Sequence, residues 1–350
     1  MSEPIFINGR FLAQPSSGVQ RYAREIVRAL DRRPGAGDYV LLTPQGAAPL
    51  DLKTIPTRTV SGAGGHPWEQ TALALAARHN RLLSLGGSGP ILHQRQTVVI
   101  HDAAVFRHPE HFRPAYAGLH RLLGRTLARR ARLATVSHFS RAELADVLET
   151  PAEAIALAPN GADHFAEIAP EQGVLDRLDV RGRPFFIALG NLAPNKNIAV
   201  MIRALRRLPD ANVRLVLVGG RDQKVFSACL GDDPRLILAG RVTDAEVAGL
   251  LGTARALVFA SLYEGFGIPP LEAFARNCPV LASDIPAVRE VCGDAPSYFG
   301  PADDAALARL MHHAIDHPAD STRRALAQER VAAYRWDASA AVLDALARTS

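Results

Sequence analysis

The chain has 350 residues and a mass of 37.6 kDa, which at roughly 100–200 residues per domain predicts two domains. It is 48% apolar and 21% charged, and its mean hydropathy is near zero. This composition predicts sizeable globular cores and excludes disordered, collagen-like and disulfide-stapled chains. The formal charge of +5 favours polyanionic partners such as phosphorylated ligands, anionic lipid surfaces or nucleic acid.

Two further features concern location. The cysteines Cys229, Cys278 and Cys292 are widely spaced and fit neither a disulfide framework nor a zinc site, which favours a reducing cytoplasm. No uninterrupted apolar run reaches the roughly 18 residues that a membrane-spanning helix needs. The N-terminus lacks a basic region followed by an apolar run, so no signal peptide is expected.

The first half of the chain predicts β-strands that alternate with helices. In chain order, the expected elements are a strand at Ile5–Asn8, a helix from Gly18 to Leu30, strands at Thr97–Ile100 and Ala134–Ser137, and a helix at Ser140–Leu148. The strands are continuous apolar runs without alternation, which is typical of parallel strands covered on both faces.

The second half repeats this pattern after a polar stretch, Glu167–Arg183, which we interpret as a linker. Strands are expected at Phe185–Leu189, Arg214–Val218, Arg235–Leu238, Ala256–Phe259 and Val280–Ala282, and a last helix begins at Trp336. The predicted fold class is α/β, with two doubly wound Rossmann-like domains, residues 1–172 and 173–335, facing each other across a cleft. Ligands of such sheets bind beyond the carboxyl ends of the strands.

The segment Ser261–Glu272 carries the strongest chemical signal. It follows a predicted buried strand and opens a helix, and Gly265 and Gly267 allow a tight turn and close approach of a ligand to the backbone. The free amides at the helix start form an anion site. Glu264 and Glu272 lie eight residues apart and cannot share a helical face, so we expect them to contact different parts of one ligand that also offers hydroxyls. The alternative is a tight turn with a capping glutamate.

This segment resembles the Glu-x7-Glu signature of the retaining GT-B glycosyltransferases of glycosyltransferase family 4. Other segments agree with that family in the expected order: Ser17–Tyr22, Val99–Asp102, Thr135–Ser140, Leu189–Asn191, Asn195–Asn197 and Gly240–Val242. The opening Phe6–Leu12 is similar to bacterial exopolysaccharide mannosyltransferases. The resemblance implies a GT-B fold with an N-terminal acceptor-binding domain and a C-terminal nucleotide-sugar-binding domain, and a final helix, residues 336–350, that crosses back to the first domain.

The resemblance also implies roles for individual residues. The implied donor-binding residues are Gly18, Arg21, Asn195, Lys196, Arg241, Val242, Glu264, Gly265, Phe266, Gly267, Ile268 and Glu272, and the implied catalytic residues are Glu264, His101 and Lys196. Glu264 would contact the transferred sugar, Glu272 the ribose and Lys196 the diphosphate. The family usually has an arginine where this chain has Asn195, and the sequence leaves open whether Arg21 or Arg241 replaces its charge.

His101 and Asp102 follow a predicted strand. The resemblance implies that the His101 backbone carbonyl faces the anomeric carbon; the alternative for a lone strand-end histidine is a ring held by a backbone partner. Asp102 is predicted to cap a helix or anchor a loop.

The reaction that the resemblance implies follows from charge. Negative charge develops on the leaving phosphate, where helix amides and Lys196 would stabilise it. The chain contains no Asp-x-Asp triplet, so no metal site and no cofactor are expected. The family suggests retention by same-face attack, in which the leaving phosphate takes the proton of the acceptor; a covalent intermediate on Glu264 is the alternative.

Eight arginines lie between Arg107 and Arg141, opposed within that segment by Glu110 and interspersed with leucines. They form either a solvated helix face or a basic amphipathic helix that rests on anionic lipid. The second interpretation predicts a peripheral protein on the inner face of the plasma membrane.

The sequence therefore predicts a retaining glycosyltransferase that moves mannose from GDP-mannose to a lipid-linked or oligosaccharide acceptor in cell-surface polysaccharide biosynthesis. The alternative is a non-catalytic two-lobed protein that binds a sugar or nucleotide sugar. A nicotinamide oxidoreductase is disfavoured because no Gly-x-Gly-x-x-Gly follows a strand. Nucleic-acid binding is disfavoured because aromatic residues are sparse among the arginines.

Overall fold

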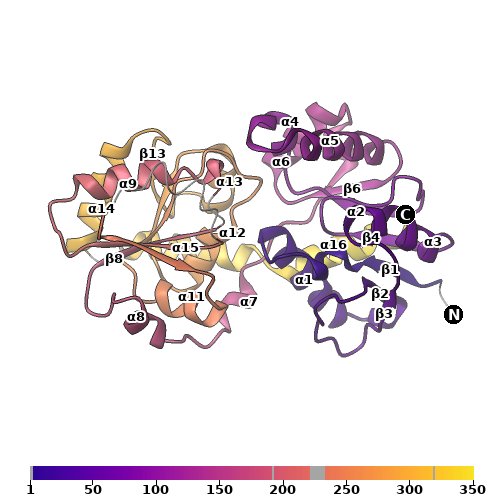
Figure 1. The fold of residues 1–350 in the computed structure, drawn as a ribbon, viewed down its shortest axis with the longest axis horizontal. Coiled ribbons are helices and arrows are strands. Elements are labelled where there is room, and N and C mark those ends of the chain that lie inside the picture. The colour runs from indigo at the N-terminus through magenta and orange to yellow at the C-terminus, as the bar shows by residue number, and fades with distance from the viewer. Residues whose placement is uncertain (1–2, 191–192, 221–232, 318–319) are drawn as a thin grey trace. The chain divides into compact units, whose positions relative to one another are not determined.

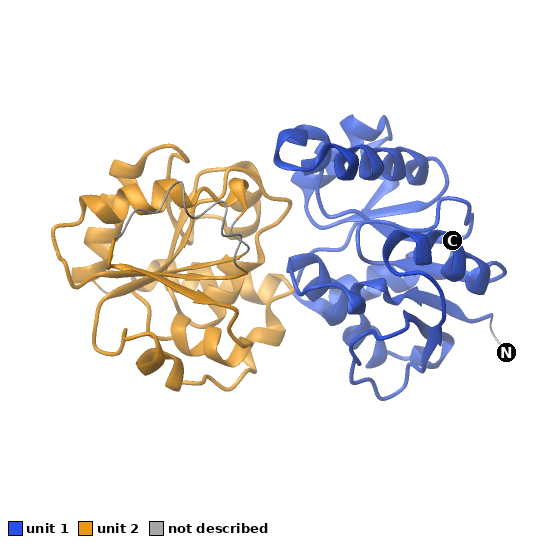
Figure 2. Cartoon of the chain, viewed as in Figure 1, with its two compact units in different colours: residues 1–160, 335–350 blue, residues 161–334 orange. Residues whose placement is uncertain are grey.

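The computed structural model describes residues 3–190, 193–220, 233–317 and 320–350. The chain divides into two compact units: unit 1 is Met1–Asn160 with Arg335–Ser350, and unit 2 is Gly161–Tyr334 (Figure 2). The sequence-based division after residue 172 falls inside unit 2. The expected linker, Glu167–Arg183, also lies in unit 2 and contains the helix α8 (Gly173–Arg177).

Unit 1 is built on a seven-stranded parallel sheet with the strand order β3-β2-β1-β4-β5-β6-β7. Its strands are β1 (Ile5–Asn8), β2 (Tyr39–Pro44), β3 (Thr57–Val60), β4 (Arg81–Ser84), β5 (Gln96–Val99), β6 (Arg132–Thr135) and β7 (Ile155–Leu157). The strand order runs outward in both directions from β1 and β4, so the topological switch point lies between them, where α/β sheets bind ligands.

Helices cover this sheet (Figure 1). They are α1 (Gly18–Asp31), α2 (Gly65–Trp68), a π-helix (Glu69–Leu73), α3 (Ala74–Ala77), α4 (Ala104–Arg107), α5 (Pro114–Ala128), α6 (His138–Leu148) and the C-terminal α16 (Trp336–Arg348). The α16 helix packs against α1 because each carries an apolar stripe at helical spacing. Tyr22 of α1 and Trp336 of α16 are fully buried, and their rings meet edge to face with centroids 5.7 Å apart.

Unit 2 contains a six-stranded parallel sheet with the order β10-β9-β8-β11-β12-β13. Its strands are β8 (Phe185–Leu189), β9 (Arg214–Val218), β10 (Leu236–Gly240), β11 (Ala256–Phe259), β12 (Val280–Ser283) and β13 (Ser297–Phe299). The switch point of this sheet lies between β8 and β11. Sequence-distant loops therefore meet beyond the ends of these two strands.

The helices of unit 2 are α7 (Asp163–Ala166), α8, α9 (Ile198–Arg207), α11 (Asp244–Leu251), α12 (Ile268–Ala275), α13 (Pro286–Cys292), α14 (Asp304–Asp316) and α15 (Ser321–Ala333). The main core lies where α9 and α14 cover the sheet, with Phe186, Val200, Leu215 and Met311 fully buried. The α12 helix packs against α15, and the Gln328 side chain donates a hydrogen bond to the Phe274 carbonyl at 2.8 Å. The hydrogen bond thus ties the C-terminal end of α12 to α15.

The predicted fold class, two doubly wound α/β domains, is confirmed. The strands expected at β1, β8, β9 and β11 have the expected bounds. The strand expected at Ala134–Ser137 instead ends at Thr135, because the Ser137 hydroxyl accepts a hydrogen bond from the Ser140 amide at 2.9 Å and caps α6. Among the described helices, none is long and apolar enough to cross a lipid bilayer.

Candidate functional site

The switch point of unit 2 brings two predicted site loops together. One follows β8 and contains Asn195 and Lys196; the other joins β11 to α12 and contains Glu264. The backbone amide of Leu262 donates a hydrogen bond to the Asn195 carbonyl at 2.8 Å, which joins the loops directly. The Asn195 side-chain amide donates to the Tyr263 carbonyl at 3.3 Å. Asn195 thus positions the Glu264 loop. The sequence, which showed only that Asn195 stands where the family usually has an arginine, did not indicate this role.

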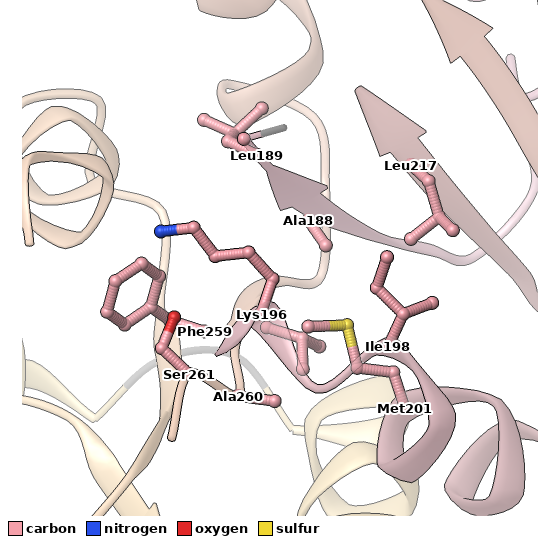
Figure 3. A pocket seen from close by; sticks show the side chains of 11 residues that line it. Ala188, Leu189, Lys196, Ile198, Met201, Leu217, Phe259, Ala260 and Ser261 are labelled. Carbon is pink, nitrogen blue, oxygen red and sulfur yellow. The ribbon is translucent and has the colours of Figure 1, made fainter. Parts of the chain in front are cut away.

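Lys196 and Glu264 form an ion pair across this point. Their side chains are 20% and 14% exposed, so both still reach solvent. The Lys196 ammonium also lies 5.5 Å from the centre of the Phe259 ring (Figure 3). The lysine lines a small hollow with Gly190, Phe259 and Ser261. A partly exposed cation in a hollow at a sheet's carboxyl edge is suited to binding an anionic ligand.

The start of α12 supplies backbone donors beside this pair. Gly267 precedes the helix with φ 92° and ψ 76°, a left-handed conformation that favours glycine. A Cβ atom there would lie 3.3 Å from the Phe259 ring. The side chains of Phe266 and Ile268 are buried, and Phe266 packs edge to face on Tyr334 at 5.2 Å. Their contribution to ligand binding can therefore come from their backbone amides, as expected for an anion site at a helix start.

Glu272 occupies a different environment from Glu264. It lies in α12, its side chain is 8% exposed, and one carboxylate oxygen is 3.7 Å from His164 Nε2. His164 lies in α7, 108 residues earlier in the chain, and no sequence motif indicated this neighbour. The two glutamates of the motif therefore have separate partners within unit 2.

Arg241 and Val242 directly follow β10, at the same edge of the sheet. Arg241 is exposed, and its Nε atom lies 3.9 Å from the position that a Cβ would take on Gly220, just beyond β9. Arg241 is thus available as a cation at this edge, two strands from the β8 end.

In unit 1, Gly18 and Arg21 begin α1. Gly18 is exposed, and the helix N-cap, Ser17, makes no side-chain cap hydrogen bond to the helix. The Arg21 amide donates to the Ser17 carbonyl at 2.9 Å.

His101 follows β5, and its contacts are internal. Its Nε2 donates to the Leu85 carbonyl at 2.9 Å, and its ring lies edge to face on Tyr22 at 4.8 Å. Burial lowers the pKa of His101 to about 4, although the bond to Leu85 opposes this shift, so the ring is neutral at physiological pH. The His101 carbonyl accepts a hydrogen bond from the Ser140 hydroxyl at 3.0 Å.

Asp102 accepts a hydrogen bond from the Ala104 amide at 2.8 Å at the start of α4, which confirms its predicted anchoring role. Among the described residues, one group of three side chains could hold a metal ion: His108, Glu110 and His111 in unit 1. This group does not include Lys196, Glu264 or Glu272. The motif residue Asn191 and the cysteine Cys229 lie outside the described residues.

Comparisons with known proteins agree with the fold. Residues 177–330 match the model of the family described as glycosyl transferases group 1. O-antigen chain mannosyltransferase B of Escherichia coli is 29% identical over 262 residues, which cover 70% of this chain and 68% of that protein. O-antigen chain mannosyltransferase RfbU of Salmonella typhimurium is 30% identical over 222 residues, covering 61% of this chain and 59% of that protein.

Solved structures show the same fold over the whole length. Sucrose-phosphate synthase of Thermosynechococcus elongatus superposes with a TM-score of 0.76 at 19% identity, covering 99% of both chains. HepE of Anabaena, in complex with UDP-glucose, gives a TM-score of 0.72 at 17% identity, again with 99% of both chains covered.

The fold is that of the GT-B glycosyltransferases. More narrowly, residues 177–330 match the glycosyl transferases group 1 family, and the similarity to the two O-antigen enzymes supports a mannosyltransferase-like glycosyltransferase. The resemblance that the motifs indicated is confirmed at this level.

Proposed function

We propose that the protein transfers mannose from GDP-mannose to a lipid-linked or oligosaccharide acceptor in cell-surface polysaccharide biosynthesis, with retention of anomeric configuration and without a metal ion. The observation that carries this proposal is the Lys196–Glu264 pair at the β8–β11 switch point, beside the amides that begin α12. The names of the relatives support mannose and a polysaccharide product.

The site supplies what departure of a nucleoside diphosphate requires. When the bond between the sugar and the diphosphate breaks, negative charge grows on the leaving oxygen. The α12 amides and the Lys196 ammonium are fixed donors for that charge, and fixed donors stabilise a transition state without reorganisation. In the family, an arginine at the position of Asn195 supplies a second positive charge for the diphosphate. Asn195 is uncharged, and its side chain is hydrogen-bonded to the Tyr263 carbonyl. We assign that task to Arg241, which is exposed at the same sheet edge.

The two glutamates would hold the neutral parts of the donor. Glu264, from the loop, accepts hydrogen bonds from sugar hydroxyls, and Glu272, from α12, accepts from the ribose. In the transfer step the acceptor hydroxyl attacks the anomeric carbon on the face that the diphosphate leaves. A new C–O bond forms, the bond to phosphate breaks, and the hydroxyl proton passes to a leaving phosphate oxygen. This route needs no enzymatic base, which agrees with a His101 ring occupied by Leu85.

Peripheral binding to anionic membrane is the location that we propose. On α5, Leu123 and Leu127 are buried in the core, whereas Leu119 and Leu122 are 39% and 61% exposed. Nearby arginines flank this apolar stripe. Arg107 is not free for lipid, because it pairs with Glu143 and Asp146 at 2.7 Å each. The exposed arginines that remain available on and after α5 are Arg125, Arg129 and Arg130.

The test is a calorimetric panel of GDP, UDP and ADP, followed by a transfer assay with the matching mannose or glucose donor. We expect GDP to bind most tightly, wild-type protein to form a mannosylated product of α configuration by NMR, and EDTA to leave the rate unchanged. The Glu264→Ala variant should remain folded and lose transfer. Preference for UDP would overturn the donor assignment, and a β-linked product would overturn retention. Nucleotide-sugar binding without turnover would favour the non-catalytic alternative.

A further inference from the structure

A second polar cluster lies in unit 1, at the switch point between β1 and β4. Its centre is Glu69, in the π-helix between α2 and α3, with a side chain that is 1% exposed. The Glu69 carboxylate accepts hydrogen bonds from Asn8 at 2.7 Å and from Arg10 at 3.0 Å. It also accepts from Ser88 at 2.8 Å and from His66 at 3.2 Å. Residues from the ends of both central strands thus converge on one buried carboxylate.

These donors keep Glu69 ionised. Burial alone would raise its pKa, but the bond from His66, the Arg10 charge and the other donors outweigh burial and lower it. A buried ion pair is seldom worth more to stability than an apolar pair of similar size. One-turn π-helices are also frequent at functional sites. The arrangement therefore points to a use beyond packing.

The cluster orients a histidine outward. Because the carboxylate accepts, His66 Nδ1 carries the proton and Nε2 is left as an acceptor. The His66 side chain is 23% exposed, and its ring lies 5.1 Å from the ring of His120 on α5. His120 Nε2 is buried and has no hydrogen-bond partner within the described part of the chain. Burial lowers the pKa of His120 to about 4, and the Arg10 charge acts in the same direction, so this ring is neutral at physiological pH.

An aromatic surface adjoins these histidines. The Tyr116 ring stacks on His120 with centroids 4.1 Å apart and on Phe112 at 5.8 Å. Tyr116 is nevertheless 47% exposed, so part of the ring is open. The α5 helix, which carries Tyr116, packs against α4, and α4 begins two residues after Asp102. The predicted catalytic turn and the aromatic surface therefore belong to one region of unit 1.

The chemistry of this region selects an uncharged, polyhydroxylated ligand. The charge of Arg10 is already balanced by Glu69, and the partly exposed His66 ring contributes a hydrogen-bonding nitrogen atom. The C–H face of a pyranose packs on an aromatic ring, whose face is electron-rich, while its hydroxyls need fixed acceptors and donors. A free phosphate would instead need an unbalanced cation.

We propose that the Glu69–His66 pair, His120 and Tyr116 form the subsite that holds the terminal sugar of the glycan acceptor. Tyr116 stacks on the sugar ring, and His66 Nε2 accepts a hydrogen bond from one of its hydroxyls. This inference rests on the proposed function and adds the class of acceptor: a neutral pyranose at the growing end.

The test uses the full chain and measures binding by NMR titration, with methyl α-mannopyranoside and differently linked mannobioses as probes. Tyr116→Leu removes the ring, and we expect saccharide affinity to fall about threefold to tenfold. His66→Ala should cost a similar factor, about threefold to tenfold, through the lost hydrogen bond. Tyr116→Phe keeps the ring and should bind within about twofold of wild type. Leu75→Ala, at a residue of unit 1 that is 63% exposed, is the control and should change nothing.

GDP affinity, measured on the same samples, separates this inference from the proposed function. Unchanged GDP binding with weakened saccharide binding in Tyr116→Leu and His66→Ala supports the subsite. Wild-type saccharide affinity in both variants would overturn it, and so would a wild-type protein that binds GDP but none of the saccharides. Inorganic phosphate is titrated as a further probe. If Tyr116→Leu and His66→Ala lose phosphate binding but keep saccharide binding, the assigned ligand class is wrong. Absence of nucleotide binding in wild type, with saccharide binding intact, would count against the proposed function alone.

Discussion

Removing the Lys196 charge and removing the Glu264 charge should change nucleotide affinity in opposite directions. The two side chains form an ion pair, and each is less than a quarter exposed. If Lys196 serves the diphosphate, then Glu264 competes with the nucleotide for the same ammonium and also repels the phosphates. Lys196→Ala should therefore weaken GDP binding, whereas Glu264→Gln should strengthen it while abolishing transfer.

The expected magnitudes follow from the contacts. A hydrogen bond to a charged group contributes about 1.5–3 kcal/mol, so Lys196→Ala should raise the Kd for GDP by about tenfold to 150-fold. A carboxylate about 7 Å from a phosphate charge, at an effective dielectric constant of about 40, repels it by about 1 kcal/mol. Glu264→Gln should thus lower the Kd for GDP by about fivefold.

Isothermal titration calorimetry with GDP and UDP measures both effects. Lys53→Ala is the matched control, because it removes the same charge from an exposed position in unit 1. Thermal unfolding of each variant checks that the fold is retained. Unchanged GDP affinity in Lys196→Ala, or weaker GDP binding in Glu264→Gln, would refute the assignment of Lys196 to the diphosphate.

Three further predictions concern the backbone, pH and lipid. Gly267→Ala should destabilise the protein by about 1–2 kcal/mol through its left-handed φ, and reduce transfer; unchanged urea unfolding and activity would contradict the strain argument. His101 has its pKa lowered from 6.5 to about 4. The unfolded chain therefore takes up a proton that the folded chain does not, and between pH 7 and 5 the free energy of unfolding should fall by about 2 kcal/mol more in wild type than in His101→Gln. Equal pH dependence in urea titrations would show that this ring does not contribute. Changing the exposed residues Arg125, Arg129 and Arg130 to glutamine should weaken binding to phosphatidylserine vesicles by about 3 kcal/mol, measured by flotation. Equal binding of the variant and the wild type would show that these arginines do not contact the membrane.

Much of unit 2 could be predicted from the sequence, because its central strands are continuous apolar runs bounded by turns. The bounds of β8, β9 and β11 follow directly from that pattern.

In unit 1, the edge strand β3 (Thr57–Val60) could not be recognised, because its side chains are mostly exposed and no apolar run marks it. The strand β13 spans three residues, too few for a pattern to develop.

The sequence indicated candidate site residues but not their pairings. The spacing of Glu264 and Glu272 indicated two separate tasks, and the structure gives them separate partners, Lys196 and His164. Neither pairing could be derived from the sequence, since the partners lie 68 and 108 residues away and only strand order brings them near. The Glu69 cluster was missed for the same reason: its members are ordinary polar residues until β1 and β4 become neighbours.

The packing of α16 on α1 makes unit 1 discontinuous in sequence, since unit 2 lies entirely between its two parts. During synthesis, residues 161–334 can complete their own sheet as soon as they leave the ribosome. The earlier segment must wait with the part of α1 that packs on α16, where Tyr22 meets Trp336, uncovered until residues 335–350 emerge. A fragment that stops at residue 160 would lack this cover, so expressing unit 1 alone requires grafting residues 335–350 onto it.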